Sequence, residues 1–205
     1  LTKSFGWGSA ETFQQHDIEE FLRVLIDNLE NKMQGTNLKD SIPHLFRGKY
    51  RNYIRCLNVD YQSVREENFY DLSMSVKGIP NLLESFRNYV KQEMLTGDNI
   101  YNAESYGPQE AIMGTEFIEF PPVLHLHLRR FMYDYTLKNG MYKINDQFVF
   151  PPSIDLTEFL AKDSPSRERS NIYDLYGVLV HQGGAFGGHY YAFLRTSTSQ
   201  QWYKF

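Results

Sequence analysis

Apolar residues recur at helical intervals in two long stretches of this chain, and elsewhere they mostly alternate with polar residues. The first stretch, 10–33, predicts an amphipathic helix, with Thr12 and Gln15 at capping-box spacing and Gly35 just past its end. The second, 81–95, predicts another helix, and a short third helix is expected over 155–161. A chain with so little helical periodicity must build most of its body from strands.

The alternating segments predict those strands. Residues 44–77 indicate an antiparallel hairpin or meander, and the glycine-containing stretch 97–115 a loop or an extended, partly exposed ribbon. A strand over 123–128 is expected to pair with 142–150 through a turn near Asn139-Gly140. After a loop over 162–171, further strands are expected over 172–182, 189–195 and 201–205. The pattern predicts one α+β domain.

Composition excludes several classes of protein. The 205 residues carry a net charge of −4, without the basic excess typical of nucleic-acid binding. No apolar run is long enough to span a bilayer, and no secretory leader is visible. The one cysteine, Cys56, cannot form an internal disulfide, so we expect the cytoplasm or nucleus. The chain starts at Leu1 rather than Met, and we expect it to be an excerpt of a longer protein.

The most informative segment runs from His181 to Tyr191, where four glycines separate two predicted strands and His189 follows the last glycine. Glycines let a narrow peptide approach the backbone closely. A histidine at the start of a strand is held rigidly and is the usual base for a cysteine or serine nucleophile. From the loop alone, a flexible hairpin with a purely structural histidine is the commoner interpretation.

Three motifs, taken together and in their order along the chain, favour the catalytic over the purely structural interpretation of His189. The first is Gln14-Gln15-His16-Asp17-Ile18-Glu19-Glu20-Phe21, and the second runs from Pro122 to Phe131 and ends in Arg-Phe. The third is Val180-His181 with Gly187-Gly188-His189-Tyr190 and Trp202. Together they resemble the histidine box and flanking segments of ubiquitin-specific proteases. Four further segments resemble the herpesvirus-associated subgroup of that family: Lys3 to Trp7, Leu45 to Lys49, Phe131 to Asp134, and Lys143 to Asp146.

The resemblance implies a papain-like fold likened to a hand, within one incomplete catalytic domain. Residues 1–43 would be the remaining part of a helical thumb, about 44–115 the antiparallel β fingers with a connecting helix, and about 116–205 a β-rich palm. The implied activity is thiol-dependent hydrolysis of the bond after the C-terminal glycine of ubiquitin. The implied partners are ubiquitin and ubiquitinated proteins, and neither nucleic acid, nor a membrane, nor a cofactor is expected.

In the family mechanism a cysteine thiolate attacks the carbonyl, and the histidine moves the proton from the thiol to the leaving amine. His189 matches that histidine. The family cysteine and the orienting Asp or Asn have no counterpart here, so we expect a chain truncated at both ends that is inactive alone. Cys56, in a predicted strand, is expected to be a small buried hydrophobe. A zinc site, which needs four ligands, is not expected beside one cysteine.

Substrate contacts follow from the same resemblance. The two arginines of ubiquitin's Leu-Arg-Leu-Arg-Gly-Gly tail need acceptors, and Gln15, Asp17 and Glu20 are the candidates. Aromatic and histidine side chains expected around the tail are Phe131, Tyr133, His181 and Tyr190. From the residues alone, the acids fit a solvated helix surface and the aromatics a plain core. A non-catalytic ubiquitin-binding module and an unrelated α+β interaction domain remain the alternatives.

Overall fold

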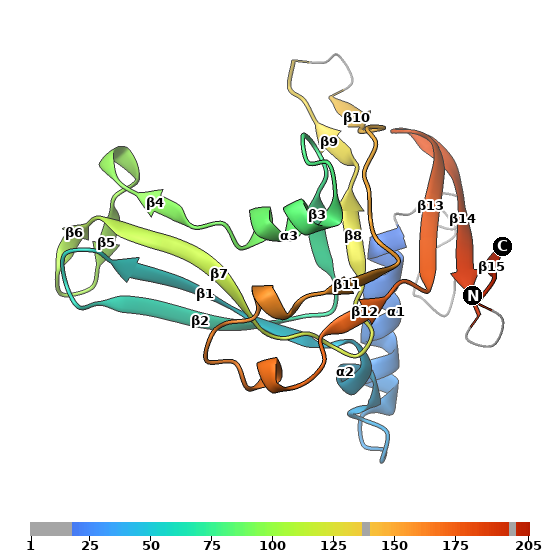
Figure 1. Ribbon diagram of the computed structural model, residues 1–205, viewed down its shortest axis with the longest axis horizontal. Helices are drawn as coiled ribbons and strands as arrows, with labels where there is room; N and C mark the ends of the chain where they lie inside the picture. The colour runs from blue at the N-terminus through green and yellow to red at the C-terminus, as the bar shows by residue number, and fades with distance from the viewer. Residues whose placement is uncertain (1–17, 137–139, 197–199) are drawn as a thin grey trace.

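The computed structural model describes residues 18–136, 140–196 and 200–205 (Figure 1). The first long helix, α1 (Ile18–Met33), confirms the predicted helix over the part that is described. It ends as predicted, because Gly35 adopts a φ of 76° and lets the Thr36 amide donate to the Met33 carbonyl. A six-residue helix that the periodicity did not reveal, α2 (Ser41–Phe46), follows directly.

A four-stranded antiparallel sheet, which we call the long sheet, extends to one side of the molecule (Figure 1). Its strands, in spatial order, are β2 (Gln62–Phe69), β1 (Gly48–Cys56), β7 (Ala111–Glu119) and β4 (Glu93–Leu95). A small hairpin at its tip comprises β5 (Tyr101–Ala103) and β6 (Gly107–Gln109), preceded by the turn η3 (Gly97–Asn99). The predicted β1–β2 hairpin and the extended ribbon within 97–115 are therefore confirmed.

The meander prediction is wrong in its third strand. β3 (Leu72–Ser75) leaves the long sheet and pairs in parallel with β8 (Leu126–Arg129), with Leu72 opposite Leu126. Parallel neighbours need a long connection, which here contains α3, β4, the β5–β6 hairpin and β7. The prediction followed the local alternation of residues 69–76, and that pattern carries no information on a partner some fifty residues away.

The second predicted helix is shorter than its apolar periodicity suggested. Helix α3 (Leu82–Tyr89) begins where the Asn81 side chain accepts a hydrogen bond from the Glu84 amide at 2.9 Å. It stops at Val90, and Glu93–Leu95 instead forms β4 along the open edge of β7. Pairing with that edge wins over the continued helical pattern. No helix among the described residues is long and apolar enough to cross a membrane.

The predicted pairing of 123–128 with 142–150 is also corrected. The strand β9 (Phe131–Tyr133) pairs with β10 (Met141–Lys143), while β8 belongs with β3. The remainder of 142–150 runs unpaired except for a bridge at Val149, and it places Phe148 in the core. The turn prediction is partly outside the described residues, but Gly140 has a φ of 67°, as a tight turn requires.

The last third of the chain contains two further sheets. β11 (Ser153–Asp155) pairs with β12 (Ile172–Asp174), and the helix expected over 155–161 is a single turn, η4 (Thr157–Phe159). A second turn, η5 (Pro165–Glu168), lies in the predicted loop. The three-stranded antiparallel hairpin sheet closes the chain: β13 (Gly177–Gly184), β14 (Gly187–Arg195) and β15 (Trp202–Lys204).

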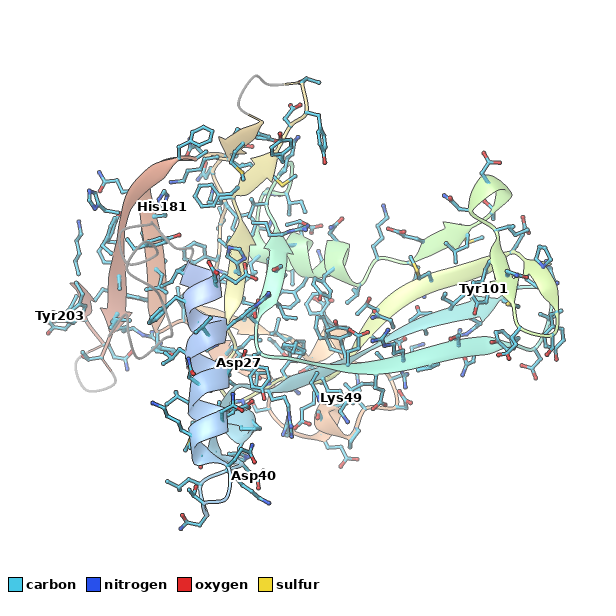
Figure 2. The ribbon with its side chains drawn as sticks, turned by 180° about the vertical axis from the view of Figure 1, so that it is seen from behind. Asp27, Asp40, Lys49, Tyr101, His181 and Tyr203 are labelled. Atoms are coloured by element: carbon cyan, nitrogen blue, oxygen red, sulfur yellow. The ribbon has the colours of Figure 1, made fainter. Side chains whose placement is uncertain are left out.

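The main core lies where the base of the long sheet meets α3, the β3–β8 pair and the segment after β10. Phe117 is at its centre, with ring centroids 4.6 Å from Phe120 and 6.1 Å from Phe86. A separate small cluster around Cys56, Ala103 and Ala111 stabilises the far tip of the long sheet. Both views show α1 between the long sheet and the hairpin sheet (Figures 1 and 2).

Candidate active site

The glycine-rich segment that the sequence singled out is a hairpin rather than an open loop. Hydrogen-bonded pairing of β13 with β14 continues through the glycines, with Gly183 opposite Gly188 and Gly184 opposite Gly187. Only Ala185 and Phe186 remain in the turn. The prediction of a loop between two strands is therefore corrected, because four glycines without side chains let the strands stay paired to their ends.

Two of these glycines are required by close approach. A Cβ on Gly188 would lie 2.3 Å from the Gln182 carbonyl oxygen and 2.5 Å from Nε2 of His181. Gly183 has a φ of 137°, and its Cβ would lie 2.4 Å from the Gly187 carbonyl oxygen. Gly184, by contrast, has open space around it. The glycines thus allow the His181 ring to lie directly over the backbone of the opposite strand.

His189 is the third residue of β14 and lies directly opposite Gln182. Because successive residues of a strand point to opposite faces, His189 and Gln182 share one face of the hairpin while His181 and Tyr190 share the other. The His189 side chain is exposed, and within the described part of the chain no group is hydrogen-bonded to its ring. A paired strand fixes its backbone, and the imidazole is accessible to a reacting group.

His181 gathers two of the other predicted residues around it. Its ring contacts Phe131 of β9 edge-on, with centroids 5.2 Å apart, and Tyr190 at 4.9 Å. Figure 2 shows His181 on the hairpin sheet, at the opposite end of the molecule from Tyr101 at the tip of the long sheet. The structure therefore brings Phe131, His181 and Tyr190 together into an aromatic wall on one face of the hairpin.

Lys143 is a residue of this cluster to which sequence reasoning gave no role in the site. Its ammonium nitrogen lies 3.0 Å from Nδ1 of His181, 2.8 Å from the His181 carbonyl oxygen and 3.0 Å from that of Gly183. The nitrogen also lies 5.8 Å from the centroid of the Phe131 ring. The signal was present, since Lys143 is in one of the segments that resembled the family, but nothing in the sequence pairs it with His181.

Tyr133, the remaining predicted aromatic residue, lies apart from this wall. Its ring packs over Gly140 and against Tyr135, with centroids 4.8 Å apart, and 57 % of the residue is exposed. It lies at the outer end of the β9–β10 hairpin, two residues beyond Phe131.

Only one of the three residues predicted to accept hydrogen bonds from the tail arginines lies in the described part of the chain. Gln15 and Asp17 lie outside the described residues, and Glu20 is exposed in the first turn of α1. The neighbouring Glu19 was not predicted to matter, yet its carboxylate contacts Nδ1 of His127 on β8 and Nη2 of Arg23 at 2.5 Å. This contact attaches the start of α1 to the strand that leads to Phe131.

Further along α1, Arg23 donates two hydrogen bonds of 3.1 Å to the Asp71 carboxylate, and Tyr70 donates to Glu30. Burial, reinforced by that hydrogen bond, raises the pKa of Tyr70 to about 12. Arg23, Tyr70 and Asp71 border a hollow of about 410 Å³ between α1 and the base of the long sheet. The helix is thus fixed against the strands by polar contacts on both sides of an open space.

Cys56 lies far from this site. It ends β1 at the tip of the long sheet, opposite the hairpin sheet (Figure 1), and is 6 % exposed among small apolar residues. The structure agrees with its interpretation as a small buried hydrophobe. Across residues 18–136, 140–196 and 200–205, no three His, Cys, Asp or Glu side chains are placed to hold a metal ion.

Comparison with known proteins identifies the class to which this arrangement belongs. The family model described as "Ubiquitin carboxyl-terminal hydrolase" matches residues 1–205. The chain is 52 % identical to "Ubiquitin C-terminal hydrolase 12" of Arabidopsis thaliana over 208 residues. It is 46 % identical to "Ubiquitin carboxyl-terminal hydrolase 15" of Saccharomyces cerevisiae and 50 % identical to "Ubiquitin carboxyl-terminal hydrolase 7" of Drosophila melanogaster.

In each case the alignment covers 100 % of this chain but only 17–18 % of the relative. The chain belongs to the ubiquitin carboxyl-terminal hydrolase family, and it spans about a fifth of the length of the curated relatives it matches.

Proposed function

We propose that this chain forms the ubiquitin-gripping body of a deubiquitinase, in which His189 is the general base for hydrolysis after the C-terminal glycine of ubiquitin. The observation that supports this most strongly is family membership along the whole chain, with His189 exposed on a rigidly paired strand. Hydrolysis of this kind needs a base held within hydrogen-bonding reach of a thiol. A paired strand offers that precision better than a loop.

The proposed division follows the hand described for this family. We assign about 1–43 to the thumb, about 44–115 to the fingers and the connecting helix, and about 116–205 to the palm, although the ribbon strand β7 carries on to Glu119. Gln15, Asp17 and Glu20 are proposed to accept hydrogen bonds from the tail arginines. Phe131, Tyr133, His181 and Tyr190 are proposed to line the path of the tail toward His189. The contacts among Phe131, His181 and Tyr190 support grouping these three in one tail-binding surface, while His189 lies on the other face of the same hairpin.

His189 then takes a proton from the thiol of the attacking cysteine and returns it to the leaving amine. Cys56 is not proposed for that role, since it is buried at the far tip of the long sheet. Because it is the one cysteine of the sequence, we propose that the chain by itself does not hydrolyse ubiquitin conjugates. The same observation favours the second candidate, a ubiquitin-binding module without catalytic activity.

We further propose that the chain lies nearest the herpesvirus-associated subgroup, on the four segments that resemble it, including Phe131 to Asp134 and Lys143 to Asp146. Its proposed partners are ubiquitin and ubiquitinated proteins, not nucleic acid or membrane, and its proposed location is the cytoplasm or nucleus.

The test uses the full-length protein and ubiquitin carrying a fluorogenic amide at its C-terminus. His189→Ala should abolish hydrolysis while the affinity for ubiquitin stays within about twofold of the wild type, since the base acts on the chemical step. His44→Ala, which changes an exposed histidine on α2, is the matched control and should leave both unchanged. Undiminished hydrolysis by His189→Ala would refute the catalytic role, and ubiquitin binding without hydrolysis by the wild type would favour the binding module.

A further inference from the structure

A second hollow, which we call the basic hollow, lies where the ends of β3 and β8 meet α3 (Figure 1). Its volume is about 370 Å³, at the lower end of the roughly 300–1,000 Å³ typical of small-ligand sites. The side chains around it belong to Ser75, Lys77, Ile79, Asn88, Arg129 and Met132. Two of them are cationic and none is acidic, so the hollow is suited to an anion.

The polar side chains around the basic hollow are mainly hydrogen-bond donors. The register of β3 and β8 places Arg129 opposite Ser75, and Nη2 of Arg129 donates to Oγ of Ser75 at 2.5 Å. Nζ of Lys77 donates to the hydroxyl oxygen of Tyr142 at 2.9 Å. Because a guanidinium has five N–H donors and an ammonium has three, each cation keeps donors for a ligand. The exposed amide of Asn88 on α3 adds further N–H donors.

The two cations also lack a neutralising partner. In the part of the chain that the structure describes, neither Lys77 nor Arg129 forms an ion pair, whereas Arg23 and Arg51 each bind a carboxylate. Asp134 attracts Lys77 at longer range but does not border the hollow. Two cations that converge from separate elements attract an oxyanion, and a guanidinium can bind a carboxylate or a phosphate through two parallel hydrogen bonds.

The basic hollow lies on the same side of the β3–β8 pair as the hollow between α1 and the long sheet. Ser73 borders that hollow and Ser75 the basic one, and residues two apart in a strand point to one face. The hollow beside α1 is bordered by Asp27 and Asp71 as well as by Arg23. One face of the fold therefore has carboxylates near α1 and only cations near α3. This difference would orient a ubiquitin molecule whose arginine-bearing tail lies near the start of α1.

We propose that the basic hollow binds an acidic side chain on the globular part of ubiquitin, with Arg129 as the main contact and Lys77 as the second. The inference deepens the proposed function and rests on it for the identity of the substrate. The volume is several times that of an inorganic anion, which favours a side chain carried by a protein over a free ion. Arg129 lies two residues before Phe131 of the aromatic wall, so one ubiquitin molecule can contact both.

The test measures KM and kcat for ubiquitin C-terminal amide hydrolysis by the full-length protein at low and high salt. Arg129→Met should raise KM about fivefold at low salt with kcat within about twofold, the size expected for one charged hydrogen-bonded contact. The increase should shrink at high salt, because salt screens exposed charges. Lys77→Met should have a smaller effect in the same direction. Lys162→Met removes an exposed charge between η4 and η5, and as the matched control it should change neither constant.

A charge exchange identifies the partner group. Arg129→Glu should raise KM at least about tenfold, because it replaces attraction by repulsion. Among ubiquitin variants that each carry one surface Asp or Glu replaced by Lys, one should restore most of this loss and should bind the wild-type protein more weakly. Restoration by none of them would overturn the assignment to ubiquitin. Calorimetric binding of inorganic phosphate by the wild type but not by Arg129→Met would then assign the hollow to a free anion.

Failure of this inference is distinguishable from failure of the proposed function. Thermal unfolding of Arg129→Met should match that of the wild type, since Arg129 is exposed. An unchanged KM in this folded, active variant, or an equal increase in Lys162→Met, would overturn the inference alone. Full hydrolysis by His189→Ala would overturn the catalytic function instead. If the wild type binds ubiquitin without hydrolysing it, the same comparison is made on the dissociation constant, and equal values for Arg129→Met and the wild type would overturn the inference.

Discussion

The core at the base of the long sheet and the hairpin sheet use aromatic residues in opposite ways. In the core, Phe117 is fully buried and its ring packs against those of Phe69, Phe86 and Phe120. In the hairpin sheet the large side chains are mostly exposed, reaching 72 % for Phe186. The first region is stabilised by burial. The second has its shape set by backbone pairing and glycine contacts, which leaves its faces open for binding.

This difference predicts that substitutions in the core reduce stability, whereas substitutions in the hairpin sheet reduce function first. The largest effect is expected for Phe117→Ala, which deletes a ring with no room for the neighbours to collapse. Its free energy of unfolding should fall by about 3–5 kcal/mol, measured by denaturant unfolding. Phe186→Ala in the hairpin turn is the matched aromatic control and should change it by less than about 0.5 kcal/mol. If Phe117→Ala and Phe186→Ala lowered the free energy of unfolding by similar amounts, the proposed difference between the core and the hairpin sheet would be wrong.

Gly188→Ala tests the hairpin sheet directly. The added methyl group would collide with the Gln182 carbonyl and the His181 ring, displacing the aromatic wall and disturbing the strand that carries His189 on its other face. We expect hydrolysis of a ubiquitin C-terminal amide by the full-length protein to fall at least about tenfold, with a stability loss of only about 1–3 kcal/mol. Gly184→Ala, which meets open space four residues earlier, should keep wild-type activity. If both variants remain active, close packing at Gly188 is irrelevant to function.

Arg51 sharpens the comparison from the side of the long sheet. It donates to Glu116 on β7 and to Asp163 in the segment after η4, which attaches that segment to the sheet. Arg51→Met should lower the free energy of unfolding by about 1–2 kcal/mol through lost charged hydrogen bonds. Arg65 forms a largely exposed ion pair with Glu67. The control Arg65→Met should therefore lower the free energy of unfolding by less than about 0.5 kcal/mol.

The stability lost in Arg51→Met should also depend on pH. The hydrogen bond from Arg51 holds the pKa of Asp163 below its ordinary value. The stabilisation is therefore complete at neutral pH, above the pKa of Asp163 in the unfolded chain, and is lost as the pH falls through the lower folded value. The stability gap between wild type and Arg51→Met should narrow on acidification, and a gap that widens would contradict the assignment.

The smallest expected effect concerns His125, just before β8. Its ring stacks on Phe46 of α2 with centroids 5.0 Å apart, and burial lowers its pKa. As the pH falls below about 6.5, His125 is protonated in the unfolded chain before it is protonated in the folded chain. The free energy of unfolding therefore falls with the pH. His125→Phe keeps the stacked ring, so it should lose less stability than the wild type between about pH 7.5 and about pH 5. His44→Phe is the exposed control and should behave like the wild type.

Local patterns in the sequence predicted the elements that depend on near neighbours. Residues 18–33 are helical because their apolar side chains recur on one face, and β1 with β2 and β13 with β14 are hairpins between adjacent segments. The pairing of Leu72 with Leu126 could not be predicted, since it joins two short strands far apart in the chain. Glu93–Leu95 was misassigned to a helix because the free edge of β7 decides its conformation.

The residues of the candidate site likewise divide into those that a local motif identified and those whose partners lie on other elements. His181, His189 and Tyr190 came from one motif within a single hairpin, and Phe131 from a second motif that the fold brings beside it. Lys143 and Glu19 were missed because their partners, His181 and His127, lie on other elements. A motif identifies a residue that carries chemistry, whereas the residue that orients it is known only once the chain has folded.

The most direct test of the account is hydrogen–deuterium exchange of the full-length His189→Ala protein with ubiquitin and with ubiquitin lacking its C-terminal tail. Intact ubiquitin should slow exchange across 180–193 of the hairpin sheet, and the tail-less form should not. The core around Phe117 should be unaffected by either. Equal protection by both forms, or none in the hairpin with intact ubiquitin bound, would contradict the claim that this open surface receives the tail.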